Sequence, residues 1–182
     1  MPNRPVVRSH RVAFSLALTL AFASTSALVA PAVFADQLGP MQILARDLGT
    51  PKVGYTARDD KHARTMLEFV RTTETVKNWT KLFTVIATHV DVDRTQAVTL
   101  AQIQRLRDDL LNSRAKISTY QVRAQVPRMA YFKYVIDGET NVGVIFSPIP
   151  GVVTMQQVAA RRTGVVTAHD IRRMKQLVGY PG

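Results

Sequence analysis

The chain has 182 residues and no cysteine, and its 24 lysines and arginines against 13 acidic residues give a formal net charge of +11. The absence of cysteine excludes disulfides, thiol catalysis and a lipid-modified N-terminal cysteine, so a folded domain must be held together by its apolar core. The strong positive charge favours association with anionic surfaces, or it simply maintains solubility.

The first 35 residues have the pattern of a secretory signal peptide. A basic start without any acidic residue precedes an apolar run over residues 12–30, and Val33 and Ala35 are small residues three and one positions before a cleavage site. We therefore expect residues 1–35 to be a signal peptide that is removed after Ala35. The alternative is a retained anchor, because the run approaches the roughly 20 residues that span a bilayer.

Cleavage would leave residues 36–182 as the mature chain, exported to the periplasm or the medium, with no transmembrane segment. Loss of the three leader arginines leaves 21 basic residues against 13 acidic ones, a net charge of +8. The expected anionic surfaces are phospholipid, lipopolysaccharide and cell-wall polymer, and nucleic acid is not expected as a partner outside the cytoplasm.

The N-terminal part of the mature chain begins without a clear element. Residues 36–60 contain several turn-forming glycines and prolines, which predict an irregular lead-in. The remaining residues, 61–182, are expected to form one domain. Its first two strands are predicted at residues 62–71 and 79–89, the second being rich in β-branched and aromatic side chains.

The strongest helix signal starts at Thr99, which lies three residues before Gln102 in a capping-box pattern. The helix is predicted to end near Asn112. Such a helix, with one apolar side, is typical of a helix that lies on the apolar face of a sheet. Its apolar residues recur at helical spacing and are Leu100, Ile103, Leu106 and Leu110.

Four further strands are predicted after this helix, at residues 117–125, 128–136, 141–147 and 152–162. Asp137-Gly138, between the second and the third of these strands, is a hairpin signal. A second helix is predicted to start at Thr167, which pairs with Asp170 in another capping-box pattern, and to stop at Gly179.

These elements predict the α+β class. We expect a single domain with an antiparallel sheet of about five or six strands and two amphipathic helices packed on one face. Runs of strands joined by tight turns favour antiparallel pairing, and the single apolar stripe of each helix provides one side for packing.

The segment Glu74–Val85, ETVKNWTKLFTV, places an acidic turn before Trp79-Thr80 and a threonine-containing strand. This W-[ST]-x-x-x-T strand motif resembles a pattern of small exported bacterial proteins of unknown function, in which a helix and a late hairpin follow. The resemblance implies a leader and one α+β domain, and it implies no catalytic residue.

The segment HVDVD alternates His89, Asp91 and Asp93 with valines, and an extended strand would point all three to one side as candidate metal ligands. A metal site needs ligands that converge from several elements, and the mature chain holds few other histidines. The alternative is that the strand ends near His89 and the two aspartates are solvated in the following loop. We expect the second arrangement, with no metal and no cofactor.

Basic residues lie close together in the C-terminal part of the sequence and are the predicted binding residues. Together they could form a patch for phosphate or sulfate groups, or for an acidic partner. The alternative is the solvated side of a helix whose C-terminal end favours positive charge. The five residues are Arg161, Arg162, Arg172, Arg173 and Lys175.

Signatures of catalysis are missing: no serine lies in G-x-S-x-G, and the zinc-protease and P-loop motifs are absent. An enzyme would instead bring Glu68, Asp91 and His89 together in one pocket as an acid/base set. We expect a non-enzymatic exported protein that binds an anionic envelope component or an envelope protein, as an accessory factor of a secretion or envelope apparatus. The alternative is a small cell-wall or ester hydrolase.

Overall fold

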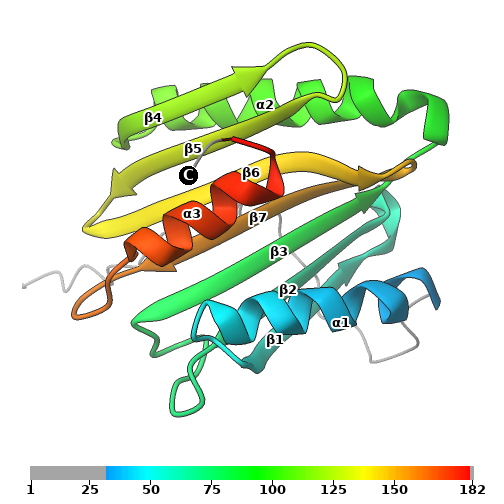
Figure 1. Ribbon diagram of the computed structural model, residues 1–182. Helices are drawn as coiled ribbons and strands as arrows, with labels where there is room; N and C mark the ends of the chain where they lie inside the picture. Colours follow the sequence, from blue (N-terminus) through cyan, green and yellow to red (C-terminus); the bar gives the residue numbers. More distant parts are fainter. Residues whose placement is uncertain (1–31, 181–182) are drawn as a thin grey trace, which may run out of the picture.

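One antiparallel sheet of seven strands and three α-helices make up residues 32–180, which the computed structural model describes (Figure 1). The α+β class is confirmed, with more strands and one more helix than predicted. The helices are α1 (Ala32–Asp47), α2 (Thr95–Asn112) and α3 (Ala168–Leu177). The strands are β1 (Lys52–Asp59), β2 (Arg64–Val70), β3 (Lys81–His89), β4 (Lys116–Arg123), β5 (Met129–Ile136), β6 (Glu139–Ile149) and β7 (Val152–Ala160).

The strand order β1-β2-β3-β7-β6-β5-β4 joins two antiparallel meanders at the centre of the sheet. The first three strands follow one another, α2 carries the chain to the far edge, and β4 to β7 return strand by strand to β3 (Figure 1). The central pair runs from Lys81 opposite Ala160 to His89 opposite Val152. The centre of the sheet therefore connects segments that are far apart in the sequence.

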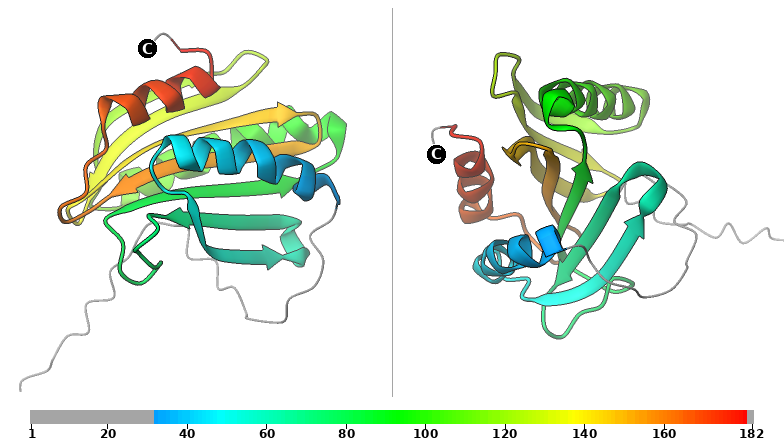
Figure 2. Two further views of the ribbon diagram at one scale, coloured as in Figure 1. Left: turned by 60° about the horizontal axis from the view of Figure 1, so that its bottom comes forward. Right: turned by 90° about the vertical axis from the view of Figure 1, so that its right-hand side faces the viewer.

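The helices cover both faces of the sheet: α2 lies on one face, and α1 and α3 lie on the other (Figure 2). On the α2 face, Ile103 packs in a cluster with Phe132. On the opposite face, Leu44 of α1 and Met174 of α3 pack in a cluster with Phe83. The prediction that two helices pack on one face is therefore wrong, because α2 and α3 lie on opposite faces.

Strand β5 shows the physical reason for the two covered faces. Successive side chains of a strand point to opposite faces, and in β5 Phe132 belongs to the cluster under α2 whereas Tyr131 belongs to the cluster under α3. Both side chains are buried. Strands that are buried on both faces have near-continuous apolar sequences, and MAYFKYVI of β5 is such a sequence.

The prediction of an irregular lead-in over residues 36–60 is wrong, because this segment contains most of α1 and all of β1. Met41, Leu44 and Leu48 recur at helical spacing and are buried against the sheet. Gly49, which suggested a loop, follows the end of α1 with a φ of 76°. Glycine in the left-handed region is a common helix terminator, so the glycine ends a helix in place of marking an irregular segment.

The predicted signal peptide lies mostly outside the described residues, which start at residue 32. The predicted cleavage site after Ala35 falls within the first turn of α1. Among residues 32–180, no helix combines the length and the apolar character needed to cross a membrane.

Helix α2 starts at Thr95, four residues before the predicted start, so the capping box assigned to Thr99 is wrong. Thr99 is buried inside the helix, and its hydroxyl donates to the carbonyl of Thr95 at 2.8 Å. The helix start is held by Thr95, whose Oγ1 donates to the carbonyl of Val92 at 2.7 Å and accepts from the backbone N–H of Gly151 at 2.8 Å. This tertiary contact has no local sequence pattern.

Helix α3 starts with the predicted capping box, which is confirmed. Thr167 Oγ1 accepts from the backbone N–H of Asp170 at 3.2 Å, and Asp170 Oδ2 accepts from the backbone N–H of Thr167 at 2.7 Å. The other carboxylate oxygen of Asp170 accepts from Lys81 Nζ at 2.7 Å, and both side chains are buried. One carboxylate therefore caps α3 and ties it to β3.

Candidate anion-binding pocket

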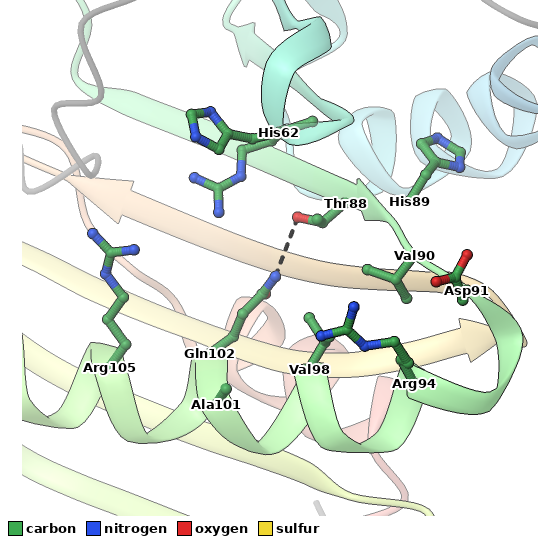
Figure 3. A pocket seen from close by; sticks show the side chains of 11 residues that line it. His62, Thr88, His89, Val90, Asp91, Arg94, Val98, Ala101, Gln102 and Arg105 are labelled. Atoms are coloured by element: carbon green, nitrogen blue, oxygen red, sulfur yellow. Dashed lines mark hydrogen bonds between the residues drawn. The ribbon is translucent and has the colours of Figure 1, made fainter.

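A cavity of about 850 Å³ lies between one side of α2 and the adjacent ends of β2 and β3 (Figure 3). The side chains around it are unusually basic: of eleven lining residues, five are arginine or histidine and one is acidic. The acidic residue is Asp91. The basic residues are His62, Arg64, His89, Arg94 and Arg105.

The wall of the pocket that α2 provides is basic at both ends and less polar in the middle. Arg94, just before α2, and Arg105 are separated by about three helical turns, on the order of 16 Å along the axis. Val98, Ala101 and Gln102 lie between them on the same side of the helix, as their spacing requires (Figure 3). The pocket is therefore elongated along α2.

The opposite wall comes from the sheet. Arg64, the first residue of β2, pairs across the sheet with Thr88 of β3. Thr88 Oγ1 accepts a hydrogen bond of 3.1 Å from Gln102 Nε2, which fixes α2 against β3 at the middle of the pocket (Figure 3). This bond holds the two walls in a defined relation, so the arginines on both walls face one cavity.

The surroundings of Arg64 disfavour the charged form of its guanidinium group. Burial and then the positive charge of Arg105 lower the pKa of Arg64, and only the charge of Asp59 opposes them. The Nε of Arg64 is buried and has no hydrogen-bond partner among the described residues. In that part of the chain, neither Arg64 nor Arg105 forms an ion pair. A buried donor without an acceptor costs free energy that a bound anion would recover.

Asp59, the carboxylate whose charge acts on Arg64, is already engaged. Asp59 Oδ2 lies 2.6 Å from His62 Nδ1, and this hydrogen bond lowers the pKa of Asp59. Asp59 therefore serves His62 and compensates only part of the positive charge of Arg64.

The predicted candidates in HVDVD are not brought together as a metal site. Strand β3 ends at His89, and Asp93 lies in the short 3₁₀ helix η2 (Val92–Arg94), so the alternation of an extended strand is lost. His89 and Asp91 line the pocket, and Asp93 does not. Figure 3 shows the His89 ring pointing away from Arg94 and Arg105. The described residues contain no group of three or more potential side-chain ligands that could hold a metal ion.

Two of the five predicted binding residues hold a loop in place. The guanidinium of Arg161 lies 4.0 Å from the ring centroid of Trp79, and its Nε donates to the carbonyl of Trp79 at 3.0 Å. Arg162 donates to Asn78 Oδ1 at 2.6 Å. These contacts fix the β2–β3 connection against the end of β7, where the single tryptophan is buried in a cluster with Val70 and Leu82.

The three basic residues of α3 lie elsewhere and on different sides of the helix. Arg172 and Arg173 line a smaller cavity of about 400 Å³ beside α1, where Arg173 Nε lies 2.5 Å from Asp47 Oδ2. Lys175 Nζ lies 5.8 Å from the ring centroid of Tyr131 on β5. The five residues therefore form three separate groups, and binding by them stays a prediction.

The acid/base set of the hydrolase hypothesis is divided in the same way. His89 and Asp91 line the pocket, whereas Glu68 is not part of its lining. Glu68 is half-buried on β2, and burial raises its pKa. The three groups do not converge in one cavity.

The arginines of the pocket were not among the residues predicted from the sequence to bind a ligand. Arg94 and Arg105 fall on one side of α2 only when the helix is extended back to Thr95, and a helical wheel of this longer segment could have shown them. Arg64 joins them through the pairing of β2 with β3 and the packing of α2, for which the sequence carries no local signal.

Comparisons with known protein families, with curated proteins and with solved structures find no match for this chain.

Proposed function

We propose that this protein is a non-enzymatic, exported binding protein that takes an anionic component of the cell envelope into the pocket beside α2. The observation that carries the proposal is that Arg64, Arg94 and Arg105 line one cavity. Within the part of the chain that the structure describes, Asp91 is the only acidic residue in its lining. Arginine suits this task because its planar guanidinium binds phosphate and carboxylate groups through paired hydrogen bonds.

The charge of the expected mature chain supports the same function. Residues 36–182, with 21 basic residues against 13 acidic ones, carry a formal net charge of +8, which attracts anionic partners over a longer range than any single contact. The pocket volume of about 850 Å³ lies within the range of small-molecule sites. Headgroups of anionic lipids and charged sugars of envelope polymers have the matching charge and size.

The test is co-sedimentation of the purified protein with vesicles that contain phosphatidylglycerol, compared with vesicles of phosphatidylcholine alone. We expect Arg94→Glu combined with Arg105→Glu to weaken binding at least tenfold, because two attractive charges become repulsive. The matched control is Arg107→Glu combined with Arg114→Glu, which makes the same change of charge on exposed residues outside the pocket. Equal loss of binding in both double variants would show that only the net charge matters, and the pocket would not be the site.

The export part of the proposal rests on the leader pattern of residues 1–35. Protein recovered from the periplasm or the medium is expected to start at Asp36, as N-terminal sequencing would show. Recovery of chains that start at Met1 and stay in the cytoplasm would contradict export. The packing of α1 is compatible with this cut, because Met41, Leu44 and Ala45, which pack against the sheet, follow the cleavage site.

A further inference from the structure

The pocket is electrostatically asymmetric along α2. At the end near the start of the helix, the residues that line the cavity include the acidic Asp91 as well as Arg94 (Figure 3). At the other end, Arg105 lowers the pKa of Arg64 through its charge, and none of the described residues that line the cavity there is acidic. The strongest attraction for an anion is therefore at the Arg64–Arg105 end.

Two guanidinium groups that form no ion pair with a described residue match an anion with two charges. A phosphomonoester has a second pKa near 6 and carries a charge between about −1.5 and −2 at neutral pH, and its oxygens can accept from both guanidinium groups. A phosphodiester carries one charge and leaves one of the two arginines uncompensated. The buried, unpaired Nε of Arg64 is one donor that such a ligand would satisfy.

The rest of the cavity has room for more than the phosphate. The wall between the two ends consists of Val98, Ala101 and Gln102 on α2, with Val90 opposite them. This mostly apolar wall suits the organic part of a ligand. The polar side chains of Gln102 and Thr88, which are hydrogen-bonded to each other, would orient that part.

We propose that Arg64 and Arg105 bind the phosphate of a phosphomonoester, with the organic part of the ligand extended along α2 toward Arg94. The inference rests on the proposed function, since it concerns the same pocket, and it adds the chemical class of the ligand and the end of the pocket at which its charge is bound.

The test compares soluble and membrane-bound probes with one or two charges. The soluble pair is phenyl phosphate and the diester methyl phenyl phosphate, measured by calorimetric titration at pH 7.5. The membrane pair is phosphatidic acid and phosphatidylglycerol, presented in vesicles at equal mole fraction. We expect the monoester to bind at least tenfold more tightly than the diester in one pair or in both, and the pair that shows the preference identifies a free metabolite or a lipid as the source.

Variants place the phosphate within the pocket. Arg64→Gln and Arg105→Gln are each expected to weaken monoester binding at least tenfold, Arg94→Gln to weaken it less, and Arg107→Gln to leave it unchanged. Arg105 is exposed on the helix surface, so Arg105→Gln keeps the test valid even where Arg64→Gln reduces folding, which circular dichroism would detect. Arg64→Lys retains the charge but loses the paired hydrogen bonds, and intermediate affinity is expected.

Equal affinity for monoester and diester, or a loss at Arg94 as large as at Arg105, would overturn the inference. The proposed function would survive that result if anionic vesicles still bind through Arg94 and Arg105. Absence of binding to every anionic probe would remove both proposals.

Discussion

Glu68 and Glu74 are two carboxylates with opposite environments, and their environments shift their pKa in opposite directions. Burial alone raises the pKa of Glu68. Burial also opposes ionisation of Glu74, but hydrogen bonds from Thr80 and from the backbone of Lys81 outweigh it and lower its pKa. The two residues therefore make contributions of opposite sign to the pH dependence of stability.

For Glu68 the folded state binds the proton more tightly than the unfolded state does. The free energy of unfolding therefore falls as the pH rises from 4.5, the ordinary pKa of glutamate, through the raised pKa of Glu68. This loss of stability persists at neutral pH. We expect Glu68→Gln to raise the denaturant midpoint at pH 7 and to lose this gain at pH 4. Urea unfolding at both pH values would measure it.

Glu74→Gln is the control for this prediction, since its sign is reversed. A lowered pKa stabilises the folded state above the ordinary value of 4.5, and this stabilisation is lost as the pH falls through the lowered pKa. The variant is therefore expected to be less stable than the parent at pH 7 and equal to it at low pH. A higher midpoint at pH 7 for Glu74→Gln, or a lower one for Glu68→Gln, would show that these assignments are wrong.

At the residue scale, the sequence identified some members of the pocket for another reason. His89 and Asp91 were candidates as metal ligands, and both line the cavity, although they do not form a metal site with Asp93. The arginines that define the charge of the cavity come from β2, η2 and α2. Their meeting depends on packing between elements, whereas the basic residues that are neighbours in sequence are separated in space.

At the scale of elements, the N-terminus of α3 depends on one buried ion pair. Asp170 accepts from Lys81, from the backbone N–H of Thr167 and from the hydroxyl of Thr167. Its relative exposure is 0%, and that of the Lys81 side chain is 8%. Removal of the carboxylate would leave a buried ammonium without a counter-ion, which is more costly than the absence of both charges.

Asp170→Ala is expected to lower the free energy of unfolding by about 3–5 kcal/mol. The same measurement on Lys81→Met combined with Asp170→Ala should recover part of this loss, because no unpaired charge then remains. Asp93→Ala, an exposed aspartate in η2, serves as the control and should change stability by less than about 0.5 kcal/mol. A loss for Asp170→Ala as small as that of the control would mean that the pair does not hold α3.

The two capping boxes show what a local pattern can determine about an element. Both Thr99 and Thr167 are followed three residues later by a residue suited to a capping box. At Thr167 the pattern is a helix start, and at Thr99 it is not, because the chain is already helical from Thr95 through its contact with Gly151. A local signal therefore predicts a cap reliably only where no tertiary contact starts the helix earlier.

At the scale of the whole molecule, α1 is part of the core. Leu48 has a relative exposure of 1% and belongs to the same cluster as Phe83 and Met174. α1 is also tied to α3 by Asp47, which lies 3.2 Å from His169 and forms an ion pair with Arg173. The helix is therefore expected to be required for stability of the mature chain.

Leu48→Ala tests this expectation and should lower the free energy of unfolding by about 2–5 kcal/mol, because a fully buried leucine side chain is lost from the core. Ile43→Ala is the matched control in α1, which ends one residue before Leu48, since Ile43 is 66% exposed. Chemical denaturation of the two variants gives the comparison. Similar midpoints for Leu48→Ala and the parent protein would show that α1 does not pack on the sheet in solution.

Elements with local signals are predictable from short stretches of the sequence. The β-branched and aromatic content of residues 81–89 predicts β3. Asp137-Gly138, with φ values of 49° and 78°, forms the predicted hairpin between β5 and β6. The capping box of Thr167 and Asp170 specifies the start of α3. Each of these signals depends on neighbours within a few residues, so no other part of the chain is needed to interpret it.

Which strands pair and which helices share a face depends on packing across the whole chain. Pairing of β3 with β7 places the two meanders in one sheet, and burial of both faces places α2 opposite α1 and α3. That arrangement brings Arg64 of β2 beside Arg105 of α2. Contacts of this kind are selected by the packing of many apolar side chains at once, and no single stretch of sequence contains that information.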